Sequence, residues 1–225
     1  MSLTPRKIIK NRFTRWIMKY LRKARMKIRQ KKHMREKYNS LKRLGRQHGV
    51  DFGGYLSKEQ LNLEQHKGCA YEPSYDMPHL LEKLQVTPQD CFVDIGCGKG
   101  YAMHYFSSLP FGKIAGIEIT EQLVEIAREN LKKLHPDDDR FEVIWGDACN
   151  YSSYDEYNYI YLYNPLNQEG IREIVEQLKQ SLERVPRKIM VIYQNPAHWK
   201  EFCKDDLFQS VVFIDRCLLL RHSGR

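Results

Sequence analysis

The feature that most limits what this chain can fold into is a glycine-rich turn. It reads FVDIGCGKG over residues 92–100, and it follows directly on the apolar run that begins at Cys91. The apolar residues are typical of a buried strand, and a helical pattern follows over 99–108. Glycine adopts backbone conformations that other residues avoid and lets the chain approach a ligand closely. We therefore expect a strand, a tight turn and a helix, with a ligand at the turn.

Strand-like and helical patterns alternate from this turn to the C-terminus. Expected strands lie near 91–96, 113–119, 141–146, 157–164 and 188–194, and expected helices lie near 99–108, 121–134, 168–184 and 197–203. This alternation indicates βαβ units around a parallel sheet. The last two strand-like runs, 209–215 and 217–222, follow each other too closely for a parallel crossover and must form an antiparallel hairpin. The sequence predicts a doubly wound α/β fold.

The charge of the chain is divided unevenly between its two ends. Residues 1–46 carry 18 Lys and Arg against one acid, whereas the rest carries 19 Lys and Arg against 27 acids. We predict three parts: a basic helical arm over 1–46, a linker and cap segment over 47–88, and a core over 89–225. Such asymmetry indicates an anionic partner for the arm, either a membrane surface or nucleic acid.

The arm also carries an apolar stripe. A helix start is expected at Thr4-Pro5, and Ile9, Phe13, Trp16 and Tyr20 then recur at helical spacing. An apolar face with aromatics, flanked by Lys and Arg, is typical of a helix lying on an anionic membrane. RNA is the alternative, because the charge persists to Arg46, beyond the stripe. In a third interpretation the stripe packs on the protein itself.

The glycine spacing indicates which ligand the turn binds. It is G-x-G-x-G rather than the G-x-G-x-x-G of dinucleotide sites, and Asp94 stands two residues before Gly96. A dinucleotide site presents a helix N-terminus to a pyrophosphate anion. S-adenosylmethionine carries an ammonium and a sulfonium instead, and a carboxylate suits these cations. We therefore predict that Asp94, Gly96, Gly98 and Gly100 bind S-adenosylmethionine.

Two further acids follow the next two expected strands. Glu118 stands 18 residues after Gly100 and can accept hydrogen bonds from ribose hydroxyls. Asp147, followed by Ala148, can accept from the adenine amino group. Open α/β sheets bind their ligands at the carboxyl ends of the strands, so we place Glu118, Asp147 and Ala148 in the same site as Asp94.

With these residues the chain resembles the class I S-adenosylmethionine-dependent methyltransferases from about Tyr71 to the C-terminus. The resemblance rests on the acidic glycine-rich loop, Glu118, Asp147 and the terminal hairpin. It implies a seven-stranded sheet of order 3-2-1-4-5-7-6 with S-adenosylmethionine as the methyl donor. It says nothing about the acceptor.

The fourth expected strand ends in Asn164-Pro165. This pair resembles part of the N-P-P-aromatic motif of amine-methylating relatives, in which the Asn and a backbone carbonyl hold the target nitrogen, but the second Pro and the aromatic are missing. We assign Asn164 and Pro165 to acceptor positioning, with Asn195 as a further candidate. The alternating tyrosines Tyr157, Tyr159, Tyr161 and Tyr163 are expected to share one buried face.

The segment before the glycine turn supplies the remaining candidates. Tyr71 and Ser74, with Tyr75, are candidates to contact the methionine end of the donor or the acceptor, and an ordinary polar loop is the alternative interpretation. A helix is expected over 77–84. His104 is interpreted as a solvated or core histidine rather than a base. We see no zinc spacing among the six cysteines.

The sequence predicts an enzyme that transfers a methyl group from S-adenosylmethionine to an oxygen or nitrogen acceptor. A membrane-proximal or envelope glycan is the first acceptor class, and RNA or protein nitrogen is the alternative. A nicotinamide-dependent oxidoreductase and a non-catalytic binding module are the alternatives from other classes. Unpaired cysteines and the lack of a signal segment indicate a cytoplasmic protein, peripheral at the inner membrane face.

Overall fold

A computed structural model describes residues 35–63 and 66–224 of the chain. Residues 35–48 are helical, whereas the expected stripe of Ile9, Phe13, Trp16 and Tyr20 lies outside the described residues. Leu44–Arg225 forms one compact unit, and it contains the whole sheet. Within the described part of the chain, no helix has the length and apolar character needed to cross a bilayer.

The sheet has seven strands in the order β3-β2-β1-β4-β5-β7-β6, so the predicted order is confirmed. The strands are β1 (Cys91–Ile95), β2 (Lys113–Glu118), β3 (Phe141–Trp145), β4 (Tyr159–Tyr163), β5 (Ile189–Gln194), β6 (Gln209–Ile214) and β7 (Cys217–His222). The first five are parallel, and β7 pairs antiparallel to both β5 and β6. Asp215 and Arg216, both with positive φ, form the two-residue turn of the predicted hairpin.

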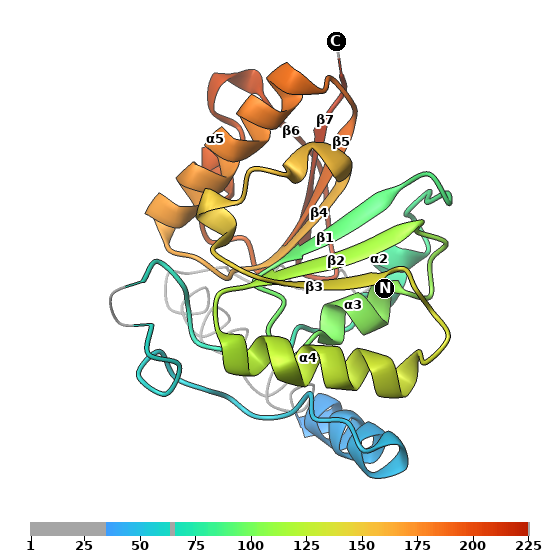
Figure 1. Ribbon diagram of the computed structural model, residues 1–225. Helices are drawn as coiled ribbons and strands as arrows, with labels where there is room; N and C mark the ends of the chain where they lie inside the picture. The colour runs from blue at the N-terminus through green and yellow to red at the C-terminus, as the bar shows by residue number, and fades with distance from the viewer. Residues whose placement is uncertain (1–34, 64–65, 225) are drawn as a thin grey trace, which may run out of the picture. The chain divides into compact units, whose positions relative to one another are not determined.

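Helices cover both faces of the sheet (Figure 1). One face packs against α2 (Pro78–Leu81), α3 (Tyr101–Phe106) and α4 (Glu121–Leu134), and the other packs against α5 (Gln168–Arg184). Side chains alternate along β1: Phe92 belongs to the α3 side, and Val93 belongs to the α5 side. This is the predicted doubly wound arrangement, and it leaves the carboxyl ends of the parallel strands at one edge.

Three local predictions are wrong. The expected helix over 197–203 is reduced to the short 3-10 turn Trp199–Glu201, where Gln168, Arg172 and Lys204 hold the Glu201 side chain. A second 3-10 turn, Lys204–Asp206, follows it. The expected helix over 77–84 is reduced to the single turn α2. Tyr157 packs on the α5 face, whereas Tyr159 and Tyr161 pack on the α3 face. Because β4 begins only at Tyr159, its alternation does not extend to Tyr157.

Candidate active site

Two cavities of about 250 and 240 Å³ open at the carboxyl edge of the parallel strands. They share part of their lining, namely Gly68, Gly96, Glu118, Ile119 and Pro165. The larger cavity extends toward the tips of β4 and β5 and reaches Asn164 and Asn195. The smaller one lies beyond β2 and reaches Asp147 and Ala148. Strand tips therefore bring together most of the predicted site residues, as the topology requires.

The glycine turn runs between β1 and α3 with three residues in the left-handed region. The φ angles are 73° at Gly96, 53° at Gly98 and 82° at Gly100, a conformation that favours glycine. A Cβ at Gly96 would lie 2.6 Å from Pro165 Cβ, and one at Gly98 would lie 2.4 Å from the Tyr71 ring. Gly100 does not line either cavity and instead faces Ala127 of α4 at the start of α3.

Asp94, near the end of β1, is a buried carboxylate in the wall of the larger cavity. Asp94 as a whole residue is 3% exposed, and it lines this cavity. Among the described residues, none donates a hydrogen bond to it at normal distance. Burial, and then the neighbouring charge of Glu118, raise the pKa of Asp94 well above its usual range. The fold therefore keeps a carboxylate at a position where it lacks a cation.

Glu118 ends β2 and joins the second strand to the glycine turn. Its Oε2 accepts from the Gly98 N–H at 2.9 Å, and its Oε1 accepts from the Thr120 N–H at 2.9 Å. Burial raises the pKa of Glu118, and these two backbone N–H groups oppose that rise. The carboxylate lines both cavities. It therefore shapes the turn and keeps acceptor capacity toward a ligand, since a carboxylate has about four acceptor positions.

Asp147 and Ala148 follow β3 in the wall of the smaller cavity. Asp147 Oδ1 accepts from the Cys149 N–H at 2.9 Å, and Oδ2 accepts from Asn150 Nδ2 at 2.8 Å. These bonds cap the short 3-10 turn Ala148–Asn150. Asp147 is thus held in one orientation in the wall of the cavity and keeps further acceptor positions.

Tyr71 and Ser74 come from the segment before α2, and both line the larger cavity. The Tyr71 ring lies over the Gly98 backbone, and its hydroxyl donates to the Phe52 carbonyl at 2.9 Å. Lys99, buried in the glycine turn, donates to Asp51 Oδ2 at 2.6 Å and to the carbonyl of Gly53 at 2.8 Å. The Lys99 contacts, which hold residues 51–53 beside the turn, were not predicted from any sequence pattern.

Gln194, at the end of β5, is a second residue that the sequence reasoning missed. It is fully buried, and its amide pairs with the backbone of Tyr75: Oε1 accepts from the Tyr75 N–H at 3.1 Å, and Nε2 donates to the Tyr75 carbonyl at 3.2 Å. The Tyr161 hydroxyl also donates to Oε1 at 2.8 Å. A polar residue closing the buried run IMVIYQ was the available signal. Gln194 fixes the wall that carries Ser74.

Asn164 and Pro165 leave β4 at the rim shared with the glycine turn. Asn164 has a φ of 44°, and its Oδ1 accepts from the Tyr193 hydroxyl at 3.3 Å. The Pro165 carbonyl accepts from the Cys69 N–H at 2.8 Å. Asn195 also has positive φ and lines the larger cavity. The structure therefore gathers Asn164, Pro165 and Asn195 at one end of the larger cavity.

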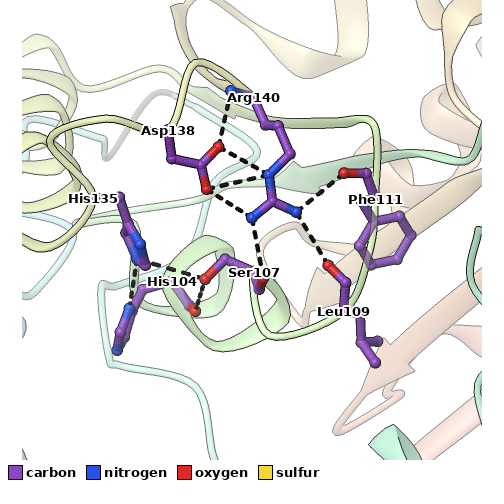
Figure 2. A network of polar contacts seen from close by, with 7 residues as sticks. All are labelled: His104, Ser107, Leu109, Phe111, His135, Asp138 and Arg140. Atoms are coloured by element: carbon purple, nitrogen blue, oxygen red, sulfur yellow. Dashed lines mark hydrogen bonds and ion pairs between the residues drawn. The ribbon is translucent and has the colours of Figure 1, made fainter. Parts of the chain in front are cut away.

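His104 takes part in a network that is separate from the cavities (Figure 2). Its Nδ1 lies 2.9 Å from His135 Nε2, and its ring stacks on Phe52 with centroids 5.9 Å apart. Burial, and then the charge of His135, lower the pKa of His104 to about 4. Nearby, Arg140 donates to the carbonyls of Ser107, Leu109 and Phe111. His104 is not among the residues that line the larger cavity.

The comparisons with known proteins agree with this arrangement. Residues 87–212 match a family described as a methyltransferase domain. A probable cobalt-precorrin-6B C(15)-methyltransferase (decarboxylating) of Methanococcus maripaludis is 31% identical over 133 residues, which cover 59% of this chain and 70% of that protein. The chain belongs to this methyltransferase-domain family and is a class I S-adenosylmethionine-dependent methyltransferase.

Solved structures with a similar fold include a SAM-dependent methyltransferase from Aquifex aeolicus. It has a TM-score of 0.48 and 14% identity, with 64% of this chain and 88% of that chain covered. An RNA methyltransferase from Salinibacter ruber in complex with S-adenosylhomocysteine has a TM-score of 0.45 and 20% identity, with 65% and 88% covered.

Family membership confirms the predicted enzyme class and the predicted methyl donor, S-adenosylmethionine. The nicotinamide-dependent oxidoreductase is thereby set aside.

Proposed function

We propose that the two cavities together bind S-adenosylmethionine, and that Asn164 and Pro165 present an oxygen or nitrogen acceptor to it. The observation that carries this proposal is Asp94: a carboxylate in the cavity wall that is 3% exposed and lacks a cation. Burying an uncompensated carboxylate is costly, and a ligand cation would remove that cost. The residues therefore fit a donor that carries an ammonium and a sulfonium.

The other candidates have complementary positions around the same space. Glu118 would accept from ribose hydroxyls where the two cavities meet, and Asp147 with Ala148 would contact the adenine in the smaller one. The Gly96 backbone, Tyr71 and Ser74 would enclose the methionine end. The donor supplies an activated methyl group, so the protein's task is mainly to align the acceptor with it.

At the acceptor end, Asn164 and Pro165 have fixed orientations. The Tyr193 hydroxyl holds the Asn164 amide, and the Cys69 N–H holds the Pro165 carbonyl. Each oxygen retains an acceptor position. We assign both groups to positioning the acceptor and not to removing its proton, because an amide and a carbonyl are poor bases.

We further propose a membrane-proximal or envelope glycan as the acceptor, with the protein peripheral at the inner face of the membrane. The support is the basic arm with its apolar stripe, which suits an anionic lipid surface. The described residues that line the larger cavity include Glu72, Asp94 and Glu118 but neither Lys nor Arg. A phosphate of an RNA acceptor would be repelled there, which disfavours RNA as the molecule at the reacting end.

Calorimetry with S-adenosylhomocysteine, and separately with NAD, tests the donor site. Binding of S-adenosylhomocysteine alone is expected, and binding of NAD alone would contradict the proposal. Sedimentation with anionic liposomes beside a gel shift with structured RNA, both at physiological salt, tests the arm. RNA binding without liposome binding would reverse the proposed partner.

A further inference from the structure

From the charges around the larger cavity we infer that its outer end accepts a protonated amine, the amino group of an aminosugar, with Glu72 as its binding partner. This inference rests on the proposed function, because it names the acceptor for the same site. Glu72 lies on the segment before α2, and Tyr163 lies at the tip of β4. The Tyr163 hydroxyl donates to Glu72 Oε2 at 3.3 Å, and both residues line the cavity beside Asn164 and Asn195.

The first argument is charge. Three carboxylates line the cavity, and the described lining includes no Lys, Arg or His. The donor brings two cationic groups and one carboxylate, which leaves a net charge of +1. Asp94 can be matched by the donor's ammonium, and Glu118 already accepts from two backbone N–H groups. Glu72 is left with a phenol as its neutral partner, so an acceptor cation would give this carboxylate an ionic partner.

Two basic side chains near these aromatic rings, Lys99 and Arg216, do not change that balance. Lys99 is paired with Asp51. Arg216, in the turn between β6 and β7, stacks on the Tyr75 ring at 4.5 Å from its centroid. It is not one of the residues that line the cavity. The Tyr75 ring separates it from Tyr163, whose ring meets Tyr75 edge to face at 5.8 Å.

The second argument is the nature of the walls. Five tyrosines line the cavity, at positions 55, 71, 101, 161 and 163. Aromatic faces attract cations and pack against the apolar face of a sugar ring. The amides of Asn164 and Asn195 supply donors and acceptors for sugar hydroxyls. Walls of this kind suit a neutral ring that bears one amine, and they suit a phosphorylated ring poorly.

Glu72 would also take up a proton. An ammonium has no lone pair, so it must lose one proton before its nitrogen can accept a methyl group. The Glu72 carboxylate is placed to receive that proton. The nitrogen lone pair would then form the new bond to the methyl carbon while the carbon–sulfur bond of the donor breaks and its electron pair stays on sulfur. Glu72 is thus assigned to binding and to proton acceptance, whereas Asn164 and Pro165 are assigned to orientation.

Calorimetry on the full chain saturated with S-adenosylhomocysteine tests this inference with glucosamine, glucose and glucose 6-phosphate. We expect glucosamine to bind at least tenfold more tightly than glucose, and glucose 6-phosphate to bind at least tenfold more weakly. Glu72→Gln should remove the advantage of glucosamine and leave glucose within about twofold. Glu82→Gln, at an exposed acid outside the cavity lining, is the matched control and should change nothing.

Several results would overturn the inference. They are equal binding of glucosamine and glucose, tightest binding of glucose 6-phosphate, an advantage for glucosamine that survives in Glu72→Gln, and no binding of any of the three sugars. The wild-type series is decisive even if Glu72→Gln does not fold. Failure of S-adenosylhomocysteine to bind in the first step would instead refute the proposed donor site, so the two failures are distinguishable.

Discussion

Replacing Asp94 by Asn removes the charge of the buried carboxylate while it keeps the size of the side chain. If Asp94 binds the ammonium of the donor, the variant loses one charge-assisted hydrogen bond, which contributes about 1.5–3 kcal/mol. S-adenosylhomocysteine has the same ammonium as the donor, so its affinity should fall by about ten- to hundredfold. Asp137→Asn, at an exposed position after α4, is the control and should bind normally.

The same substitution should not destabilise the free protein. Burial raises the folded-state pKa of Asp94, and therefore the folded chain binds protons more tightly than the unfolded chain. The pKa of an aspartate in the unfolded chain is about 3.9. As the pH rises from this value to the higher pKa of Asp94 in the folded chain, the folded protein loses stability, because its carboxyl group must ionise while buried. Asp94→Asn removes this loss, so its Tm without ligand should equal or exceed that of the wild type at neutral pH.

Proton release provides a second measurement of the same carboxylate. A bound ammonium favours ionised Asp94 and lowers its pKa, so S-adenosylhomocysteine should displace a proton wherever the free carboxyl is protonated. Calorimetry in two buffers of different ionisation enthalpy measures that release, which should shrink in Asp94→Asn. Unchanged affinity in a folded variant, or a lower Tm without ligand, would refute the assignment of Asp94 to a ligand cation.

Three further substitutions test other parts of the structure. Glu118→Ala should lower the affinity for S-adenosylhomocysteine at least tenfold by calorimetry. The variant loses the hydrogen-bond acceptor for the ribose and the two backbone hydrogen bonds that shape the turn. Unchanged affinity would show that Glu118 is not the acid that binds the ribose. Lys99→Met should speed hydrogen exchange over 50–56 about ten- to hundredfold, since a bond to this buried ammonium contributes about 1.5–3 kcal/mol. Lys132→Met, at an exposed position on α4, is the control and should leave the exchange unchanged. Arg140→Lys should lower the free energy of unfolding, measured in urea, by about 1–3 kcal/mol, because Arg140 donates to three backbone carbonyls (Figure 2). The affinity for the donor should not change, and a change in that affinity would contradict a purely structural role.

The sheet and the donor side of the site were predictable because their signals are local. The strand, glycines and helix of residues 91–106 follow one another in the chain, and parallel strands bring Asp94, Glu118 and Asp147 to one edge. One error arose where such a local pattern ends. The pattern over 197–203 is helical, yet Glu201 is held by Gln168, Arg172 and Lys204 in a short turn.

The contacts that fasten the cap could not be predicted, because they join distant parts of the chain. Gln194 meets Tyr75 across 119 residues, and Lys99 meets Asp51 across 48. No periodicity or spacing marks such partners. A buried glutamine at a strand end and a lysine within a glycine turn show that some partner is needed, but they do not show which one.

This difference separates the two halves of the site physically. The proposed donor half depends on strand tips, whose positions are fixed by the sheet itself. The outer half joins Glu72 to Tyr163 and Asn164, and the Glu72 side is held in place by the Gln194 amide at the end of β5. A change at Glu72 can therefore alter the outer end of the larger cavity, whereas Asp94, Glu118 and Asp147 stay where the strands place them. That separation explains why the residues identify the donor so much more readily than the acceptor.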